Sequence, residues 1–405
     1  MVNKTRALLL CVKQNERIHK ADISSIPLTR ISWEPDVTEK LETWIRQTAG
    51  GNYKDYTPDI ETYFEKKLNK PCIAVSSGTA ALHLAIQQLK LAPGSEVIMP
   101  TLTYAACANA VLYEKLSTVF CDVNAQTWCL DATILKNVFD ERLKAGANVG
   151  VVMPVHSYGQ ASPMNEIRQI CDSYGVPIIE DVAQALGGKY EGSGLGSLGR
   201  YACFSFNANK TLTGMGGGLL ALESEEEKLH IRNLSRHGRL PFENGLAHYI
   251  HQEIGYNYQM SGYSAALIHL QLPHLRERLE RKLEIFENYS EALLTKVPLK
   301  PQSGINAKNH TRWLSCFQLL DESACESKRD ELCRYLSKNG IEARPVFKLL
   351  HQQPAYLDHT RADCEHAEHI ANSGICLPSP CDLTEKEQQR VIKTIKNWFV
   401  RQGSS

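Results

Sequence analysis

The feature that most constrains the fold of this chain is an alternation of short β-rich runs with helical patterns from about residue 72 to residue 222. Such an alternation is typical of a parallel sheet covered by helices. Helices are expected at Thr79–Leu91 and Tyr104–Leu116, and Met164, Ile167 and Ile170 share one face of a third. The predicted strands are Cys72–Val75, Glu96–Met99, Thr118–Asp122, Val149–Val155, Val176–Glu180, Tyr201–Phe206 and Gly218–Leu222.

The pattern changes after Pro273. Leu275–Leu294 predicts a long charged helix, which suits a connector between domains but equally a solvated surface helix. Residues 298–399 mix short strands and helices, which indicates a smaller α+β domain. Its last helix, Glu385–Phe399, follows Thr384, a favourable N-cap. We therefore expect an N-terminal extension of unknown role (1–25), a large domain (26–275), and a connector helix with a small C-terminal domain (276–405).

Composition excludes several classes of partner. The 405 residues suffice for two domains, and 43% apolar with 22% charged residues is ordinary for a globular protein. Lysine plus arginine equals aspartate plus glutamate, 45 each, so net charge gives no sign of a nucleic acid or membrane partner. The 13 cysteines contain no C-x-x-C pair, and Met1–Lys13 lacks a cleavage site. We expect reduced thiols, no bound metal and a cytoplasmic location.

The segment Ser76–Leu84 lies at a predicted strand-to-helix junction and begins with small residues. Small residues let backbone N–H groups approach an anion, and the helix N-terminus adds a favourable dipole. The same residues are also consistent with an ordinary capped helix start, in which Ser77 or Thr79 accepts from the first amides. Both interpretations stay open for this segment taken alone.

An acidic residue ends one predicted strand. Pro177–Glu180 is typical of a buried parallel strand, and Asp181 follows at its carboxyl end, where ligands bind in open α/β sheets. Such a carboxylate can pair with a nearby loop. If a heteroaromatic nitrogen of a cofactor faces it, the carboxylate would instead keep that nitrogen protonated, because an adjacent opposite charge favours the charged form.

A lysine follows the next predicted strand. Lys210 comes after Ala202–Asn209 and precedes a glycine-rich turn, Gly214–Gly218. A lysine that forms a Schiff base must be fixed, partly desolvated and able to lose its proton near neutral pH. A lysine after a strand is more often a surface residue, and a glycine run is more often a flexible turn. Neither feature alone predicts an active site.

The order of these three elements resembles fold-type-I pyridoxal-phosphate enzymes. From about Ile26 to Phe399 the chain is similar to the DegT/StrS family of nucleotide-sugar aminotransferases. The stretches that carry the resemblance are Ser76–Leu84, Glu96–Pro100, His156–Gln160, Glu180–Ala185, Phe204–Lys210, Glu253–Ser261 and Ile341–Phe347. The resemblance implies an aspartate-aminotransferase-type α/β large domain with a mostly parallel seven-stranded sheet, and a smaller C-terminal α+β domain.

The resemblance also implies roles for single residues. Lys210 would hold pyridoxal 5′-phosphate as a Schiff base and move the proton, and Asp181 would pair with the pyridine nitrogen. Gln184 would contact the phenolic oxygen of the ring. The remaining residues implied are Gly78, Thr79 and Ser205 at the phosphate, Asn257 at the phosphate of the neighbouring subunit in a homodimer, and Tyr104, which would lie over the ring or else be a core helix residue.

Within the family, Ser205–Lys210, Thr311–Leu314 and His351–Pro354 look most like the branch that aminates UDP-linked 4-keto-6-deoxy-N-acetylhexosamines. This similarity implies amination of such a nucleotide sugar with an amino-acid donor, L-glutamate, in amino-sugar or surface polysaccharide biosynthesis. Trp33–Tyr56 departs from the family pattern, and Gly214–Gly218 is a variant turn, so a GDP- or dTDP-linked keto sugar stays open.

Two other functions are compatible with parts of this pattern. Sugar 3-dehydratases similar to this family place histidine where Lys210 stands, so lysine favours transamination. A non-catalytic binding protein with the same fold would have no need for Lys210, Asp181, Gln184 and Ser205 together.

Overall fold

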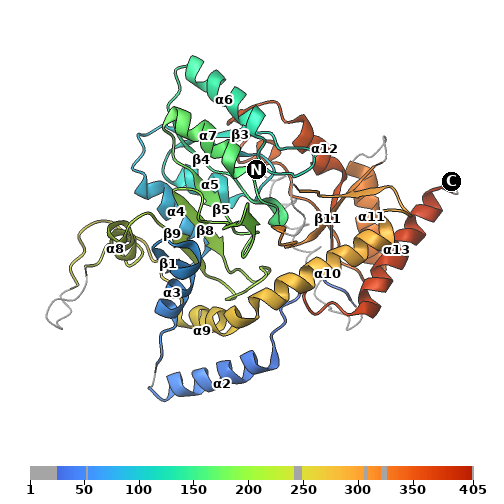
Figure 1. The fold of residues 1–405 in the computed structure, drawn as a ribbon, viewed down its shortest axis with the longest axis horizontal. Coiled ribbons are helices and arrows are strands. Elements are labelled where there is room, and N and C mark those ends of the chain that lie inside the picture. The colour runs from blue at the N-terminus through green and yellow to red at the C-terminus, as the bar shows by residue number, and fades with distance from the viewer. Residues whose placement is uncertain (1–24, 52, 241–248, 305–308, 321–325, 404–405) are drawn as a thin grey trace, which may run out of the picture.

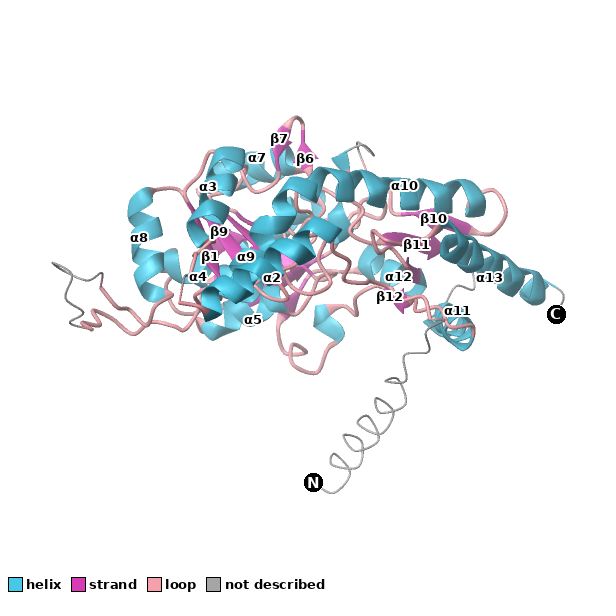
Figure 2. Cartoon of the chain, turned by 90° about the horizontal axis from the view of Figure 1, so that it is seen from below, coloured by secondary structure: helices cyan, strands magenta, loops and turns pink. Residues whose placement is uncertain are grey.

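The computed structural model describes residues 25–51, 53–240, 249–304, 309–320 and 326–403. The large sheet lies toward one end of the molecule and a smaller sheet toward the other, with the long helix α10 running between them (Figures 1 and 2). Among the described residues no helix is both long and apolar enough to cross a membrane. The cysteines that the structure describes form no disulfide.

The large sheet has seven main strands in the order β1, β9, β8, β5, β4, β2, β3. Two four-stranded ladders build it, and bridges from Val152 to Ile178 and from Val155 to Asp181 join them. β9 runs antiparallel to both neighbours and the other pairings are parallel, so the predicted mostly parallel seven-stranded sheet is confirmed. The strands are β1 (Cys72–Val75), β2 (Glu96–Pro100), β3 (Ser117–Cys121), β4 (Val149–Val152), β5 (Ile179–Asp181), β8 (Tyr201–Ser205) and β9 (Gly218–Ala221), with the short β13 (Thr360–Arg361) beside β3.

Helices cover both faces of this sheet because its strands are buried on both faces. In β1, Cys72 and Ala74 belong to one apolar cluster and Ile73 and Val75 to the other, as the period of two requires. The helices are α2 (Pro35–Ala49), α3 (Thr57–Leu68), α4 (Gly78–Gln88), α5 (Ala106–Tyr113), α6 (Ala132–Lys144), α7 (Met164–Tyr174), α8 (Glu225–Leu234) and α9 (Gly262–Gln271), and a hairpin of β6 (Lys189–Tyr190) and β7 (Ser193–Gly194) follows β5.

The expected helix start at Tyr104 was wrong. Helix α5 begins at Ala106, and the Tyr104 side chain is 62% exposed, so Tyr104 is not a core helix residue. The apolar period that predicted the helix comes from residues within it, such as Cys107 and Val111, which are buried. Tyr104 precedes the first turn and carries no part of that period.

The smaller sheet is antiparallel, in the order β10 (Leu299–Pro301), β11 (Ser315–Leu319), β14 (Gly374–Leu377), β12 (Arg344–Pro345). Helices α11 (Glu326–Lys338), α12 (Glu365–Ser373) and α13 (Glu385–Gly403) complete this part. The predicted cap of α13 is confirmed. The N–H of Glu387 donates to Thr384 Oγ1 at 3.2 Å, and the N–H of Thr384 donates to Glu387 Oε2 at 2.8 Å, which is a capping box.

Helix α10 (Leu275–Leu293) connects the two parts, and its inner face is buried, contrary to a solvated surface helix. Leu275 belongs to a core cluster of the large sheet, and Ile285 and Leu293 belong to the cluster under the small sheet. Ile26, ahead of α2, pairs with Ile341 and lies in this second cluster as well. We propose that the domains divide near residue 275, where this helix begins.

Candidate active site

Lys210 and Asp181 lie at the carboxyl ends of two neighbouring parallel strands, β8 and β5. Burial lowers the pKa of Lys210 to about 8, while the negative charge of Asp181 and the nearby Cys107 act in the opposite direction. The backbone N–H of Lys210 donates to the Asn207 carbonyl at 3.0 Å, which closes a turn shortly after β8. The lysine is therefore fixed, partly buried and able to lose its proton near neutral pH.

The Asp181 carboxylate is buried and bonded at both oxygens. The thiol of Cys107, in α5, donates to Oδ2 at 3.0 Å, and the Ala183 N–H donates to Oδ1 at 2.9 Å. Burial raises the pKa of the Cys107 thiol well above its ordinary value, so it keeps its proton and remains a donor. These two bonds hold the carboxylate in one direction.

The neighbouring residue, Glu180, points to the opposite side and is fully buried. It accepts from His156 Nε2 at 3.1 Å and from the amides of Gly196, Leu198 and Gly199 at 2.6–3.0 Å. These donors outweigh burial and lower the pKa of Glu180. A buried charge with this many donors holds the end of β5, and thereby Asp181, in one place.

Small residues form a cradle where α4 begins. Ser77 caps the helix, with its Oγ accepting from the Ala80 N–H at 3.0 Å, so the capping interpretation is correct for Ser77. A Cβ on Gly78 would lie 2.9 Å from Ser205 Cβ, so glycine is needed for β8 to approach the helix start. The first amides of a helix have no partner within it. With Gly78, Thr79 and Ser205 together, this junction can hold an anion.

Gln184 and Tyr104, the two residues expected at the cofactor ring, have their own contacts in the structure. The Tyr158 N–H donates to Gln184 Oε1 at 2.9 Å, which leaves the Nε2 end of this buried amide as its donor. The Tyr104 ring lies 6.0 Å from the ring of Phe347, measured between centroids. Its exposure suits a flat group that meets a ligand.

Asn257 is exposed, in a segment that follows the loop after α8. Tyr258 attaches this segment to the cradle strand, because the Ser76 N–H donates to the Tyr258 carbonyl at 2.7 Å. Asn257 caps neither flanking helix, since Ser235 ends α8 and Ser261 begins α9. Asparagine is a favoured helix cap, and capping of α8 or α9 would have been the alternative role for Asn257 within its own chain. A contact with a cofactor across a subunit boundary remains a prediction.

Sequence reasoning missed three residues of the site, namely Cys107, Glu180 and Trp313. The indole N–H of Trp313 donates to the Asn209 carbonyl at 2.8 Å, and Lys210 Nζ lies 4.3 Å from the centroid of its ring. Glu180 could have been found as an acidic residue inside an apolar strand, since a buried charge needs partners. Cys107 and Trp313 give no such signal.

The residues fit pyridoxal 5′-phosphate, the cofactor that the resemblance implies. Lys210 offers an amine with a pKa near neutrality, Asp181 offers a fixed carboxylate, and the glycine at position 78 leaves room at the helix start. Among the residues that the structure describes, no His, Cys, Asp or Glu side chains gather into a group that could hold a metal ion.

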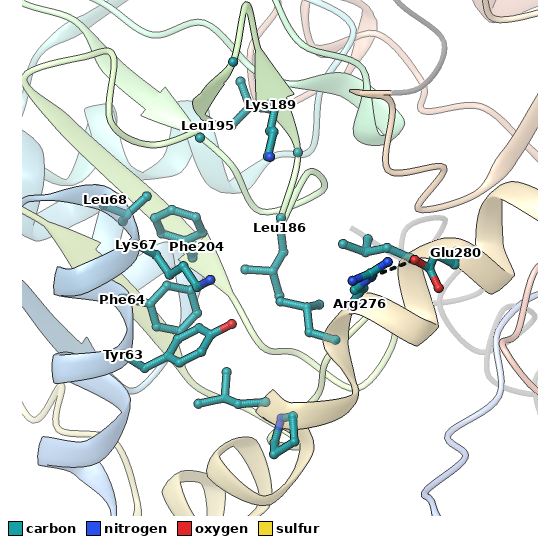
Figure 3. A pocket seen from close by; sticks show the side chains of 18 residues that line it. Tyr63, Phe64, Lys67, Leu68, Leu186, Lys189, Leu195, Phe204, Arg276 and Glu280 are labelled. Atoms are coloured by element: carbon teal, nitrogen blue, oxygen red, sulfur yellow. Dashed lines mark hydrogen bonds and ion pairs between the residues drawn. The ribbon is translucent and has the colours of Figure 1, made fainter.

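A separate cavity of about 740 Å³ lies between α3, the β6–β7 hairpin and the start of α10. Figure 3 shows Phe64, Leu186 and Phe204 along it, with Arg276 paired to Glu280 at one side. Neither Lys210 nor Asp181 lines this cavity. The chemistry of the site therefore does not lie in this wide apolar space.

Comparison with known proteins supports the same interpretation. A profile of the DegT/DnrJ/EryC1/StrS aminotransferase family matches residues 34–396. The chain is 36% identical to EpsN of Bacillus subtilis, whose name describes a pyridoxal phosphate-dependent aminotransferase, over 90% of this chain and 94% of that protein. It is 34% identical to a GDP-perosamine synthase of Caulobacter vibrioides, over 82% and 86% of the two chains.

Two further similarities complete the comparison. The chain is 30% identical to a UDP-N-acetyl-3-dehydro-α-D-glucosamine 3-aminotransferase of Acidithiobacillus ferrooxidans, over 80% of this chain and 83% of that protein. The crystal structure of a DegT DnrJ EryC1 StrS aminotransferase from Brucella abortus superposes with a TM-score of 0.81 at 26% identity. That superposition covers 90% of this chain and 96% of the other.

The lowered pKa of Lys210 predicts how fast the cofactor-free protein takes up pyridoxal phosphate. Only the neutral amine attacks the aldehyde, so the rate of covalent attachment should rise with pH and level off above about pH 8. Borohydride reduction followed by peptide mass spectrometry measures the attachment. Lys210→Ala should remain unlabelled at this position and lack turnover. A rate that keeps rising to pH 10 would show an unperturbed lysine.

Asp181→Asn should keep the cofactor detectable by absorbance but lower kcat on the order of 10²–10⁴-fold, because a neutral amide cannot hold a ring nitrogen protonated. Cys107→Ala leaves the carboxylate charge in place and should lower kcat much less. Steady-state kinetics of both variants measure the difference. Unchanged kcat in Asp181→Asn would assign this carboxylate a structural role.

Proposed function

Because the chain belongs to the DegT/DnrJ/EryC1/StrS aminotransferase family, we propose that it aminates a UDP-linked 4-keto-6-deoxy-N-acetylhexosamine with L-glutamate as donor. The family and its relatives make the chain a pyridoxal-phosphate-dependent aminotransferase of sugar nucleotides. We place the reaction in the cytoplasm, in amino-sugar biosynthesis for a surface polysaccharide.

The observation that carries the proposal is the Lys210 amine, with a pKa of about 8, in the field of a carboxylate fixed by two donors. When bound, pyridoxal phosphate supplies the electron sink for transamination. Lys210 accepts a proton from the donor amino acid and returns one to the sugar carbon, because both of its protonation states are populated near neutral pH. Asp181 would face the ring nitrogen of the bound cofactor, held in one direction by its two donors.

The presence of Lys210 also decides between the alternatives. A dehydratase similar to this family would have histidine at this position, and histidine cannot form the Schiff base. A binding protein would need neither a buried carboxylate held by a thiol nor an amine with a lowered pKa. A lysine with a shifted pKa, grouped with a carboxylate at strand ends, favours a catalytic site over a binding site.

The choice of sugar rests on a narrower argument. Ser205–Lys210, Thr311–Leu314 and His351–Pro354 resemble the branch that acts on UDP-linked 4-keto sugars. The GDP-perosamine synthase among the relatives supports a GDP-linked keto sugar as the second candidate. The 3-aminotransferase among them supports the UDP group and leaves the 3-position as an alternative site of amination.

A homodimer is part of the proposal. The segment around Asn257 extends with α8 away from the rest of the large domain (Figure 1). It exposes large apolar side chains, with Ile254 92% and Ile250 56% exposed. Large apolar side chains gathered on one protruding segment are typical of a surface that another chain covers. We propose that a second copy covers this segment and receives Asn257 at its own cofactor phosphate.

The substrate assignment predicts a selective reaction. In a panel of 4-keto and 3-keto sugars linked to UDP, GDP or dTDP, the UDP-linked 4-keto-6-deoxy-N-acetylhexosamine should give the highest kcat/KM with glutamate. Formation of 2-oxoglutarate and the mass of the amino sugar measure the reaction, and Lys210→Ala is the control for background. Faster amination of a GDP-linked sugar would replace the proposed substrate with the second candidate.

The shared site predicts complementation between inactive variants. Subunits that carry only Asn257→Ala are mixed with subunits that carry only Lys210→Ala. In a mixed dimer, the site that retains Lys210 draws its Asn257 from the Lys210→Ala partner and is intact. A 1:1 mixture should regain roughly a quarter of wild-type activity, because half of the dimers are mixed and each has one intact site.

Differently tagged subunits and two-step affinity purification isolate the mixed dimers for this assay. The Lys210→Ala protein mixed with itself is the negative control. If the mixed dimers form and remain inactive, Asn257 acts within its own chain and the proposed arrangement is wrong.

A further inference from the structure

Trp313 contacts the reactive lysine in two ways. It comes from the small domain, two residues before β11, yet its indole N–H donates to the carbonyl of Asn209, the residue before Lys210, at 2.8 Å. Its ring also faces the lysine amine, with Lys210 Nζ 4.3 Å from the ring centroid. One side chain therefore touches both the peptide that carries Lys210 and the atom that reacts.

The ring of Trp313 is held in place by its neighbours. It is 4% exposed and stacks on Tyr158, at 6.1 Å and an interplanar angle of 18°, and on Phe347, at 6.5 Å and 27°. The backbone N–H of Trp313 donates to the Tyr158 carbonyl at 3.1 Å, and the backbone N–H of Phe347 donates to the Tyr158 hydroxyl at 2.8 Å. Since Tyr158 belongs to the large domain, both domains fix this ring.

The backbone that leads to Trp313 is also constrained. Arg312 has a φ of +48°, which is uncommon for a residue other than glycine, and it is buried. A Cβ on Gly159 would lie 2.4 Å from Thr311 Oγ1 and 2.9 Å from the Arg312 nitrogen. The small-domain segment thus passes closely against residues 158–159. This close approach brings the indole to the turn that holds Lys210.

Helix α10 donates hydrogen bonds both to Trp313 and to the residue that follows Lys210. The buried Lys282 donates from Nζ to the Trp313 carbonyl at 3.0 Å and to the Ser379 carbonyl at 2.9 Å. One turn earlier, Arg278 donates from Nη1 to the carbonyl of Thr211, the residue after Lys210, at 3.1 Å. The helix therefore anchors Trp313 and the chain beside Lys210 from one face.

We propose that Trp313 is a positioning residue for Lys210. Its indole N–H fixes the peptide before the lysine, and the face of its ring favours the protonated amine between the two proton transfers. The inference rests on the proposed function, in which Lys210 moves the proton. A cation over an indole face is attracted by the ring quadrupole, and indole is the strongest of the aromatic side chains in this respect. The ring therefore works against the burial that lowers the pKa of Lys210.

The test measures Lys210 directly in the cofactor-free protein. The variants are Trp313→Phe, which keeps an aromatic face and loses the N–H donor, and Trp313→Leu, which keeps an apolar wall and loses the aromatic face. Competitive acylation with acetic anhydride across a pH series, read by peptide mass spectrometry, gives the pKa of Lys210 in each. Trp398→Leu is the matched control, because Trp398 is equally buried but lies in the core cluster of the small domain.

The two variants should separate the two contacts. Trp313→Leu should lower the pKa of Lys210 by about 0.5 unit or more, and Trp313→Phe and Trp398→Leu should leave it near the wild-type value. In the loaded enzyme, Trp313→Phe should lower kcat by up to about tenfold with KM for glutamate little changed, because one hydrogen bond that aims the lysine is lost.

An unchanged or raised pKa in Trp313→Leu would overturn the role of the ring, and so would an equal shift in Trp398→Leu. Wild-type kcat in Trp313→Phe would overturn the role of the N–H. If Trp313→Leu does not fold by circular dichroism, Trp313→Met, which also lacks an aromatic face, replaces it in the acylation, and the same outcomes apply. The acylation needs neither cofactor nor sugar, so its outcome is independent of the substrate panel that tests the proposed function.

Discussion

The buried carboxylate of Glu180 is the interaction on which the rest of the site depends. A charge with no exposure must be satisfied within the protein, and Glu180 is satisfied by three backbone amides from 196–199 and by the imidazole of His156. These donors come from the loops on either side of β5. Moving the end of β5 would break several of these bonds to a buried charge at once, so this end of the strand has one stable position.

This anchoring determines where the reactive groups lie. Side chains alternate along a strand, so a fixed Glu180 directs Asp181 to the opposite face. Asp181 then meets the thiol of Cys107 from α5, and β8 pairs in parallel beside it, which brings the turn that holds Lys210 to the same edge. The carboxyl ends of parallel strands meet at one edge of a sheet, so the parallel pairing alone brings Asp181 and the turn of Lys210 together.

How much of the fold and the site could be predicted depends on how far apart in the sequence the residues of each contact lie. The strand at Cys72–Val75 was predicted with its observed bounds, and the apolar face of Met164, Ile167 and Ile170 lies in the helix α7, because both are determined by local periodicity. The cap at Thr384 is equally local. Lys210 and Asp181 could be proposed from the sequence because each stands at or after a predicted strand end, and the order of these elements resembles a known family.

The contacts that were missed join distant segments. Trp313 lies 104 residues from Asn209, and Cys107 lies 74 residues from Asp181. A tryptophan before a strand and a cysteine in an apolar helix are more often core residues, so their types carry no signal of chemistry. Packing within the large domain places Cys107 at Asp181, and the contact between the two domains places Trp313 at Asn209.

The reactive amine lies between burial and charge. Burial alone would leave Lys210 neutral, and such a lysine could attack an aldehyde but could not hold a proton between two transfers. The carboxylate of Asp181 alone would keep it as an ammonium, which is no nucleophile. With a pKa of about 8, both forms are populated near neutral pH. A single strand end cannot supply this balance. It needs the sheet for the carboxylate and the fold around the turn for the burial, and we infer that the small domain supplies an aromatic face for the charge. A chain with two domains joined by a helix that contacts both Trp313 and the residue after the lysine meets all three conditions.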